Sequence, residues 1–290
     1  MMEKSNTKWY LLAFLGCVWG SSFILMQLGL QGVNAIHLGS LRILFAAGFL
    51  FLVGGKEIAK IPLYKWKYIA LTSIFGTFVP AFLFAIALSK IDGSVSAILN
   101  SLTPLNTLLV GMFFFGLDVQ RRQIFGVIIG FVGCALLVLS GSGANTTENY
   151  YYAILIVLAS IFYGINVNLI KKYLSDLKPL TISTGNFVVM FVPALIVLYF
   201  TGFFEIVGQE KVQNSLGYIA VLGVIGTGLS NILFFKLIQL SSPVFASSVT
   251  YIIPLVAIFL GSLFMNESLT LLQIAGALIV LVGVYFSSRK

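Results

Sequence analysis

The stretch WYLLAFLGCVWGSSFILMQLGL, residues 9–30, runs for 22 residues without a charged side chain. A membrane-spanning helix needs about 20 consecutive apolar residues, so this stretch is long enough to cross a bilayer. Similar stretches recur along the chain, of whose 290 residues 59% are hydrophobic and 9% are charged. Soluble domains carry about 25% charged residues. The composition therefore excludes a soluble enzyme, a nucleic-acid-binding protein and a disordered protein, and it predicts an all-α polytopic membrane protein.

The other apolar stretches have a similar length, and the connectors between them are too short to hold a soluble domain. We therefore predict ten transmembrane helices. Their expected bounds are Trp9–Leu30, Ala35–Val53, Trp66–Ser89, Gly93–Phe115, Gln123–Ser140, Tyr151–Ile170, Leu180–Thr201, Leu216–Ile238, Val244–Met265 and Leu271–Ser287.

Lys and Arg are unevenly distributed over the predicted connectors. With the N-terminus inside, 13 of them fall on the cytoplasmic side, 2 (Lys90 and Lys211) fall outside, and Arg42 and Lys236 lie within helices, which accounts for all 17. Cytoplasmic loops of membrane proteins are enriched in Lys and Arg. We therefore predict an integral protein of the cytoplasmic (inner) membrane with both termini cytoplasmic. The formal net charge of +8 then reflects membrane anchoring and not nucleic-acid binding.

The second half of the sequence repeats features of the first half. Residues 1–140 and 150–290 are predicted to form two five-helix repeats, and because five is odd the second repeat enters the membrane from the opposite side. A duplication without functional consequence is the alternative. The matches include, at a shift of 150 residues, Gly76-Thr77 with Gly226-Thr227 and Pro104 with Pro254, and, at a shift of 144 residues, Trp19-Gly20 with Tyr163-Gly164 and Ser22 with Asn166.

Four short motifs occur in a characteristic order along the chain. They are Trp19-Gly20-Ser21-Ser22-Phe23, Ser40-Leu41-Arg42, Pro104 followed by Phe115-Gly116-Leu117-Asp118, and Pro254 followed by Met265-Asn266-Glu267. In this order they resemble the drug/metabolite transporter superfamily, in particular its EamA-type ten-helix permeases. One departure is that Asp118 lies one residue further from its proline than Glu267 does. The resemblance implies an inner-membrane exporter of metabolites or amino acids, with a cavity framed by the first four helices of each repeat.

Polar side chains recur near the middle of the predicted helices, where they cost free energy unless they face the protein interior or water. In the fourth helix, the spacing of Ser96, Asn100, Thr103 and Thr107 places all four on one helical face. We predict a neutral, aromatic-lined substrate cavity at the midplane; the alternative is that these groups only hold helices together. The predicted substrate-binding residues are Trp19, Ser22, Asn100, Thr103, Tyr163, Asn166, Thr227, Asn231, Thr250 and Tyr251.

Two prolines and one arginine also lie within predicted helices. Pro104 and Pro254 each remove a backbone donor near mid-helix, and we predict them to be hinges, with a static kink as the alternative. Arg42 is a possible contact for an anionic substrate group; alternatively, it has a structural role or extends to the outer surface. Small residues are predicted to pack the fifth helix within its own chain, with a dimer contact as the less favoured option. They are Gly126, Gly130 and Gly133.

The titratable residues argue against an enzyme. No Asp or Glu lies mid-helix, Cys17 and Cys134 are isolated in apolar stretches, and His37 is the single histidine. Intramembrane hydrolysis needs paired acids, a metal cluster or an activated nucleophile. The sequence also has no phosphate-binding loop for ATP. We expect no catalytic residue, no metal site and no cofactor; the expected partners are a small-molecule substrate and membrane lipid, for a monomer or homodimer.

Together these patterns predict a secondary transporter that exports small amphipathic metabolites or amino acids by alternating access. Because no carboxylate lies mid-helix, facilitated diffusion or solute exchange is the simplest energy coupling. Two alternatives stay open. An exchanger for phosphorylated or nucleotide-linked metabolites would need several cations in its cavity. A non-transporting membrane receptor or assembly factor would have no use for an inverted repeat.

Overall fold

The computed structural model describes residues 2–91, 93–139, 150–265 and 270–287, and within these ranges the chain is helical and contains no strand. Seven helical segments of the described ranges are long and apolar enough to cross a membrane, namely Asn6–Leu30, Ala35–Lys60, Leu63–Leu88, Ser96–Phe115, Tyr151–Tyr173, Pro179–Phe200 and Glu210–Leu240. Two further apolar helices, Pro243–Val256 and Ile274–Ser287, are shorter than a membrane span. The prediction of an all-helical membrane protein is confirmed, while the count of ten membrane-crossing helices stays a prediction.

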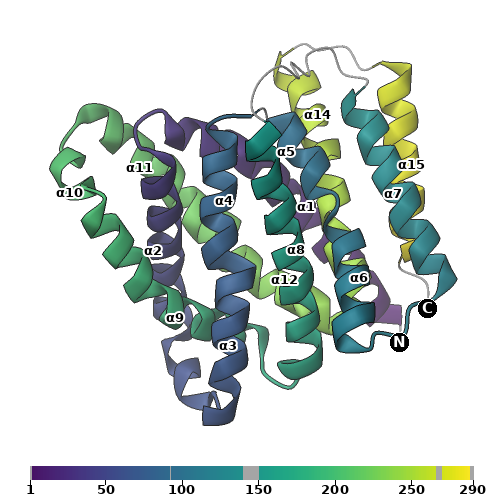
Figure 1. Cartoon of the computed structure of the whole chain (residues 1–290), viewed down its shortest axis with the longest axis horizontal. Helices are drawn as coiled ribbons and strands as arrows, with labels where there is room; N and C mark the ends of the chain where they lie inside the picture. Colours follow the sequence, from purple (N-terminus) through teal and green to yellow (C-terminus); the bar gives the residue numbers. More distant parts are fainter. Residues whose placement is uncertain (1, 92, 140–149, 266–269, 288–290) are drawn as a thin grey trace.

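The long helices run side by side as a bundle (Figure 1). The acidic residue of the second proline motif, Glu267, and the turn-rich connector 140–149 lie outside the described residues. Short helices in the connectors are η1 (Gly55–Lys60), η2 (Leu63–Lys65) and α10 (Phe203–Ile206). The uninterrupted long helices are α1 (Met2–Leu30), α2 (Ala35–Gly54), α7 (Arg121–Leu139), α8 (Tyr150–Tyr173), α9 (Pro179–Phe200) and α15 (Leu271–Ser287).

Local sequence determines where several helices begin and end. The Asn34 side chain accepts a hydrogen bond from the His37 backbone N–H at 2.8 Å and thereby caps the start of α2. Pro179 occupies the first turn of α9, where its missing N–H costs nothing. Gly116 ends the helix before it with a positive φ of 65°, a conformation that glycine adopts without strain.

The predicted third and eighth helices each contain a π-helical turn. The first consists of α3 (Trp66–Ser73), η3 (Ile74–Phe78) and α4 (Val79–Leu88), and the second of α11 (Glu210–Gly223), η4 (Val224–Leu229) and α12 (Ser230–Leu240). η3 and η4 are the π turns, and their first residues, Ile74 and Val224, are equivalent at the 150-residue shift between the halves. The sequence predicted uninterrupted helices here. Such turns are frequent at functional sites.

The predicted fourth and ninth helices are each broken into two pieces. The fourth consists of α5 (Gly93–Asn100) and α6 (Thr103–Phe115), and the ninth of α13 (Pro243–Ser247) and α14 (Val249–Met265). Pro254 lies inside α14, as predicted. Pro104 is in the first turn of α6, where its fixed φ suits a helix start, so the predicted mid-helix position of Pro104 is wrong. Hinge motion at the two prolines stays a prediction.

Helices of the first half pack mainly against helices of the second half. α7 lies along α15, α2 along α9, α1 against α14, and α6 against α8. The α7–α15 contact depends on glycine, because a Cβ at Gly126 would lie 2.5 Å from the Ser287 backbone N and one at Gly283 would lie 2.4 Å from the Gly130 backbone N. The small-residue stripe of the fifth predicted helix therefore packs within its own chain, as predicted.

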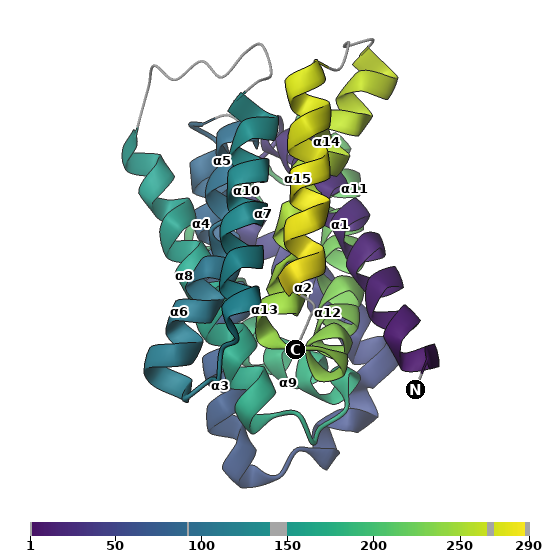
Figure 2. The ribbon, with the colours of Figure 1, turned by 90° about the vertical axis from the view of Figure 1, so that its right-hand side faces the viewer.

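Basic side chains join connectors at one end of the bundle. Figure 2 shows the start of α1, the end of α15 and the η1–η2 connector toward this end. Lys171 donates to the carbonyls of Ile238 and Ser241 at 3.0 and 2.7 Å, which neutralises the C-terminal end of α12. Lys65 pairs with Asp176, and this hydrogen bond lowers the pKa of the carboxyl group, so the pair stays charged at neutral pH. In the predicted topology, this end is the cytoplasmic one.

Candidate functional site

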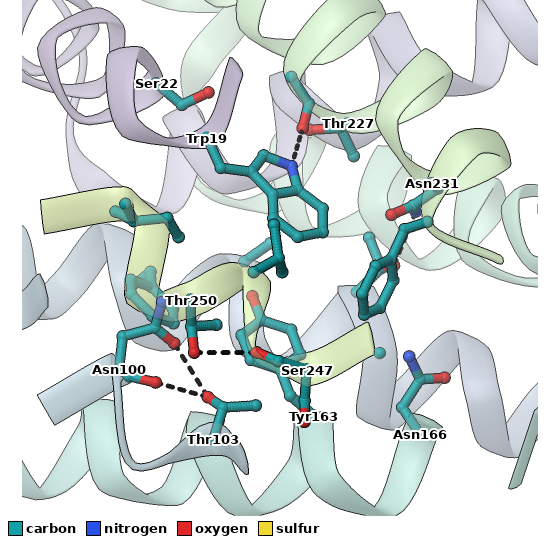
Figure 3. A pocket seen from close by; sticks show the side chains of 18 of the residues that line it. Trp19, Ser22, Asn100, Thr103, Tyr163, Asn166, Thr227, Asn231, Ser247 and Thr250 are labelled. Atoms are coloured by element: carbon teal, nitrogen blue, oxygen red, sulfur yellow. Dashed lines mark hydrogen bonds between the residues drawn. The ribbon is translucent and has the colours of Figure 1, made fainter. Parts of the chain in front are cut away.

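A cavity lies between the two halves and is lined by side chains from helices of both. Its volume is about 100 Å³, which is room for several waters at about 10–15 Å³ each, so polar groups in it can be hydrated. Arg42 and nine of the ten predicted substrate-binding residues line it. Figure 3 labels these nine. The nine are Trp19, Ser22, Asn100, Thr103, Tyr163, Asn166, Thr227, Asn231 and Thr250.

Trp19 of α1 reaches across the cavity wall to η4. Its indole Nε1–H donates to the Gly226 carbonyl at 3.0 Å, the dashed line at Trp19 in Figure 3. Its ring meets Phe234 edge-on with the ring centroids 5.1 Å apart. A buried indole N–H normally requires such a partner. The π turn thus fixes the orientation of the largest aromatic ring in the cavity.

The two π turns each place a glycine against the first helix of the opposite half. A Cβ at Gly76 in η3 would lie 2.5 Å from Asn166 Cγ on α8, and a Cβ at Gly226 in η4 would lie 2.9 Å from Ser22 Oγ on α1. The sequence alignment pairs these glycines with each other, and it also pairs Ser22 with Asn166. The halves therefore touch through equivalent residues at two places on the cavity wall.

The breaks in the fourth and ninth predicted helices place polar groups at the cavity. Pro104 has no N–H to donate to the Asn100 carbonyl, and the Thr103 hydroxyl instead donates to that oxygen at 2.6 Å. At the other break, the Thr250 hydroxyl donates to the Ser247 carbonyl at 3.0 Å. At each break one helix ends and the next begins, and residues of both ends, such as Asn100 with Thr103 and Ser247 with Val249, line the cavity.

Arg42 extends from α2 into the cavity. Its Nε–H donates to Thr227 Oγ1 at 2.5 Å, and the Thr227 hydroxyl donates to the Leu222 carbonyl at 3.1 Å. The side chain is therefore held by a residue of the cavity wall, and its contact with an anionic substrate group and its structural role both stay predictions. Among the lining residues Arg42 is the single cation and no Asp or Glu is present, and no described residue forms an ion pair with it.

Two asparagines of the cavity differ in their hydrogen bonding. Asn231 Nδ2 donates to Thr77 Oγ1 at 3.3 Å, which links α12 to η3. Asn166 is only 3% exposed, and its Oδ1 has no hydrogen-bond partner. A buried acceptor without a donor costs free energy. The Asn166 oxygen is thus a buried acceptor without a donor, and Figure 3 shows the amide nitrogen of Asn166 on the side of the cavity.

Tyr251 does not line the cavity. Its ring packs directly on Gly130, where an added Cβ would lie 2.5 Å from Tyr251 Cε2. Its hydroxyl donates to the Val127 carbonyl at 2.8 Å. Successive residues of a helix do not share a face, so with Thr250 at the cavity Tyr251 points toward α7. Its inclusion among the predicted substrate-binding residues is corrected accordingly.

The sequence-based set omitted several residues that line the cavity. Phe23 and Met26 follow Trp19 by four and seven residues, a spacing typical of one helical face that could have identified them. Phe84 and Phe234 carry no such signal, because apolar side chains facing a cavity, the core or lipid look alike in sequence. The polar omissions are Thr77 and Ser247.

Comparison with known proteins identifies similar sequences over the whole chain. The model of the EamA-like transporter family matches residues 7–139 and again residues 151–289. An uncharacterized transporter of Archaeoglobus fulgidus is 24% identical over 98% of this chain and 99% of its own. A probable amino-acid metabolite efflux pump of Salmonella typhimurium is 23% identical over 96% of this chain and 93% of its own.

Two further similarities concern substrate and fold. An S-adenosylmethionine/S-adenosylhomocysteine transporter of Chlamydia muridarum is 23% identical over 89% of this chain and 84% of its own. A solved crystal structure superposes with a TM-score of 0.75 over 98% of this chain and 96% of that chain, at 13% sequence identity. At that identity the superposition concerns the fold alone.

Proposed function

The chain belongs to the EamA-like transporter family, and from this premise we propose that it is a secondary transporter that exports small amphipathic metabolites or amino acids across the cytoplasmic membrane by alternating access. The observation that carries the proposal is the cavity, which is walled by helices of both halves and combines aromatic rings, amides and hydroxyls. Cavities of this composition suit organic solutes with an apolar body and a few polar groups.

An architecture of two inverted five-helix repeats, residues 1–140 and 150–290, has independent support. The family model matches once in each half. The two π turns begin at Ile74 and Val224, equivalent positions at the 150-residue shift, and both halves have a broken helix at the cavity. α1 packs on α14 as α8 packs on α6, which is the exchange of partners expected for related halves in opposite orientation.

Alternating access follows from this pairing of equivalent contacts. Gly226 against Ser22 and Gly76 against Asn166 are matching contacts on two sides of the cavity. In this proposal, each contact closes the path from the cavity to one side of the membrane. When one contact loosens, its path opens, and the other contact tightens and closes its own path. Because the two contacts are equivalent, the exchange changes the free energy little. The discontinuous helices at the same cavity are typical of transporters that rock around a midplane site.

The relatives narrow the substrates worth testing. One is named as an amino-acid metabolite efflux pump and another as an S-adenosylmethionine/S-adenosylhomocysteine transporter. We infer small organic solutes for this chain. A phosphorylated substrate is less well supported, because phosphate dianions call for several cations and Arg42 is the single one among the cavity-lining residues.

Counterflow in proteoliposomes tests the function. Vesicles loaded with an unlabelled solute should accumulate the labelled solute transiently, because exchange through one cavity is faster than net leak. A panel of the twenty L-amino acids, S-adenosylmethionine and sugar phosphates covers both the main and the alternative substrate class. Protein-free vesicles are the control, and absence of counterflow for the entire panel contradicts the proposal.

The membrane orientation makes a separate prediction. In a chain with Cys17 and Cys134 replaced by alanine, a cysteine at Gly208 should react with an impermeant thiol reagent added to intact cells. A cysteine at Lys56 should react only after the cells are permeabilised. Both positions are exposed, so a difference in labelling reports sidedness and not burial. The opposite pattern would place the termini outside.

A further inference from the structure

We propose that a charged latch closes the cavity toward the end of the bundle that is predicted to be cytoplasmic, and that a glycine-packed seam closes it toward the other end. The latch consists of Lys65, Tyr68, Tyr173 and Asp176. The seam is the contact of the end of α1, at Gly29 and Gly32, with the start of α11. The inference rests on the proposed transport function and deepens it, because it names the residues that control access to the cavity from each side.

The latch joins the first half to the second where α3 begins and α8 ends. Lys65 Nζ donates to the Tyr173 carbonyl at 2.9 Å and forms an ion pair with Asp176. The rings of Tyr68 and Tyr173 stack with their centroids 4.2 Å apart and an angle of 6° between their planes. The Lys65 side chain is only 8% exposed, and a buried cation is costly without a partner. The ion pair therefore favours the closed contact.

The latch continues a line of contacts that begins at the cavity. Gly76 in η3 meets Asn166 on α8 at the cavity wall. Tyr68 precedes Gly76 by eight residues and Tyr173 follows Asn166 by seven, which places the stacked rings about 10–12 Å further toward the end of the bundle. The same two segments are thus in contact from the cavity to this end, and they must separate before a path can open between them.

The end of α8 is also fixed to other helices of the second half. Lys171 donates to the Ile238 carbonyl at the end of α12, and Gln239 Nε2 donates to the Leu177 carbonyl at 2.8 Å. These bonds join the ends of α8 and α12, so the two ends form one unit. The latch is therefore a contact between halves, which is where alternating access requires a gate.

The equivalent contact of the other repeat lies at the opposite end of the bundle, between α1 and α11. Figure 1 shows α11 at the end opposite α3. The 150-residue shift places Lys65 on Ser215, and the 144-residue shift places Asp176 on Gly32. A Cβ at Gly32 would lie 2.4 Å from Ser215 Oγ and 2.2 Å from the Lys211 carbonyl oxygen. Equivalent positions are therefore in contact at both ends, through an ion pair at one end and through close packing at the other.

The tyrosines of the latch show the same difference. The shifts place Tyr68 on Tyr218 and Tyr173 on Gly29. A Cβ at Gly29 would lie 3.0 Å from Ile219 Cγ1, so α1 approaches α11 without a ring between them. The contacting atoms of the seam are uncharged, whereas the latch contains an ion pair. A change of charge at Lys65 or Asp176 should therefore open one end of the cavity and leave the other closed.

The accessibility of a cavity cysteine from each side tests the latch. Thr250→Cys, in a chain with Cys17 and Cys134 replaced by alanine, places one thiol in the cavity outside both contacts. An impermeant thiol reagent is added to intact cells, which exposes the outer side, and to inside-out membrane vesicles, which exposes the cytoplasmic side. The rate of labelling from each side reports how often the cavity is open to that side.

Removing the ion pair should open the cavity toward the cytoplasm. The Asp176 side chain is 62% exposed, so Asp176→Asn changes the charge without disturbing the core. The labelling rate from the cytoplasmic side should rise about three- to tenfold, the range for a charged hydrogen bond with one buried partner, and the rate from outside should not rise. Lys65→Met should have the same effect. The double variant should show less than the product of the two effects, because both remove one interaction.

Two further variants separate the latch from general effects of substitution. Lys60→Met removes an ion pair with Glu57 that lies within η1, at the same end of the bundle, and should leave both labelling rates unchanged. Gly32→Ala pushes on the Lys211 backbone and should open the seam instead. The labelling rate from outside should then rise about tenfold, as expected for overpacking, without a rise from the cytoplasmic side.

Wild-type labelling rates in Asp176→Asn and Lys65→Met proteins that elute normally from a sizing column would overturn the latch. An equal shift in the Lys60→Met protein would also overturn it. The labelling needs no substrate, so failure of the latch can be distinguished from failure of the proposed function. Unchanged labelling beside normal wild-type counterflow removes the latch alone, and shifted labelling without counterflow of any solute removes the transport function alone.

Discussion

Gly76→Leu should abolish transport while the protein remains folded. A Cβ at this position would lie 2.5 Å from Asn166 Cγ, so the new side chain displaces the Asn166 amide and occupies the cavity wall. The displaced atoms belong to the end of a side chain, which can rotate away, so the cost to stability is limited to about 1–3 kcal/mol of overpacking. We expect counterflow at least tenfold below the wild-type rate, in a protein that elutes normally from a sizing column.

The matched control for this substitution is Gly48→Leu in α2. No atom lies within 4 Å of a Cβ built at Gly48, so the same added volume meets open space. Counterflow of the control should equal that of the wild type. Normal flux in the Gly76→Leu protein would show that the contact between η3 and α8 is not part of the transport path.

Gly283→Leu should instead act on stability and lower the free energy of unfolding. A Cβ at Gly283 would lie 2.4 Å from the Gly130 backbone N and 2.5 Å from its Cα, and backbone atoms in a helix cannot rotate away. Helices α7 and α15 must then separate along their shared contact. We expect a loss of more than about 3 kcal/mol, which lowers the Tm by roughly 10 °C.

Thermal unfolding of the purified protein in detergent measures this effect. Gly48→Leu again serves as the control, because it adds the same side chain within a helix but without a neighbour. A Gly283→Leu protein with the Tm of the wild type would mean that α7 and α15 do not pack as closely as the structure places them.

The helical architecture could be predicted because long apolar stretches have few other solutions in a bilayer. The helix breaks and the π turns could not be predicted. Pro104 was compatible with a kink inside a helix and with the start of a new one, and only the packing of α6 against α8 decides between them. The π turns carry no local signal except the glycines Gly76 and Gly226 at equivalent positions, and glycine alone does not distinguish a π turn from an α-helix.

The candidate site was predictable where polarity and repetition coincided. Ser22, Asn166 and Thr227 are polar, lie mid-helix and have equivalents in the other half, and all three line the cavity. Tyr251 was polar and aromatic, but its helical phase turns it toward α7. The direction of Arg42 depended on Thr227, a residue 185 positions away in the chain, so no local pattern could reveal it.

The central claim is that the cavity between the halves is the substrate site and opens alternately to the two sides of the membrane. Ser22→Cys, in a chain with Cys17 and Cys134 replaced by alanine, places one thiol on the cavity wall. We predict that an impermeant thiol reagent reaches it from either side of oriented proteoliposomes, that substrate slows the reaction, and that the modified protein no longer carries out counterflow. Full counterflow after complete modification, or reaction from one side only during active exchange, would contradict the claim.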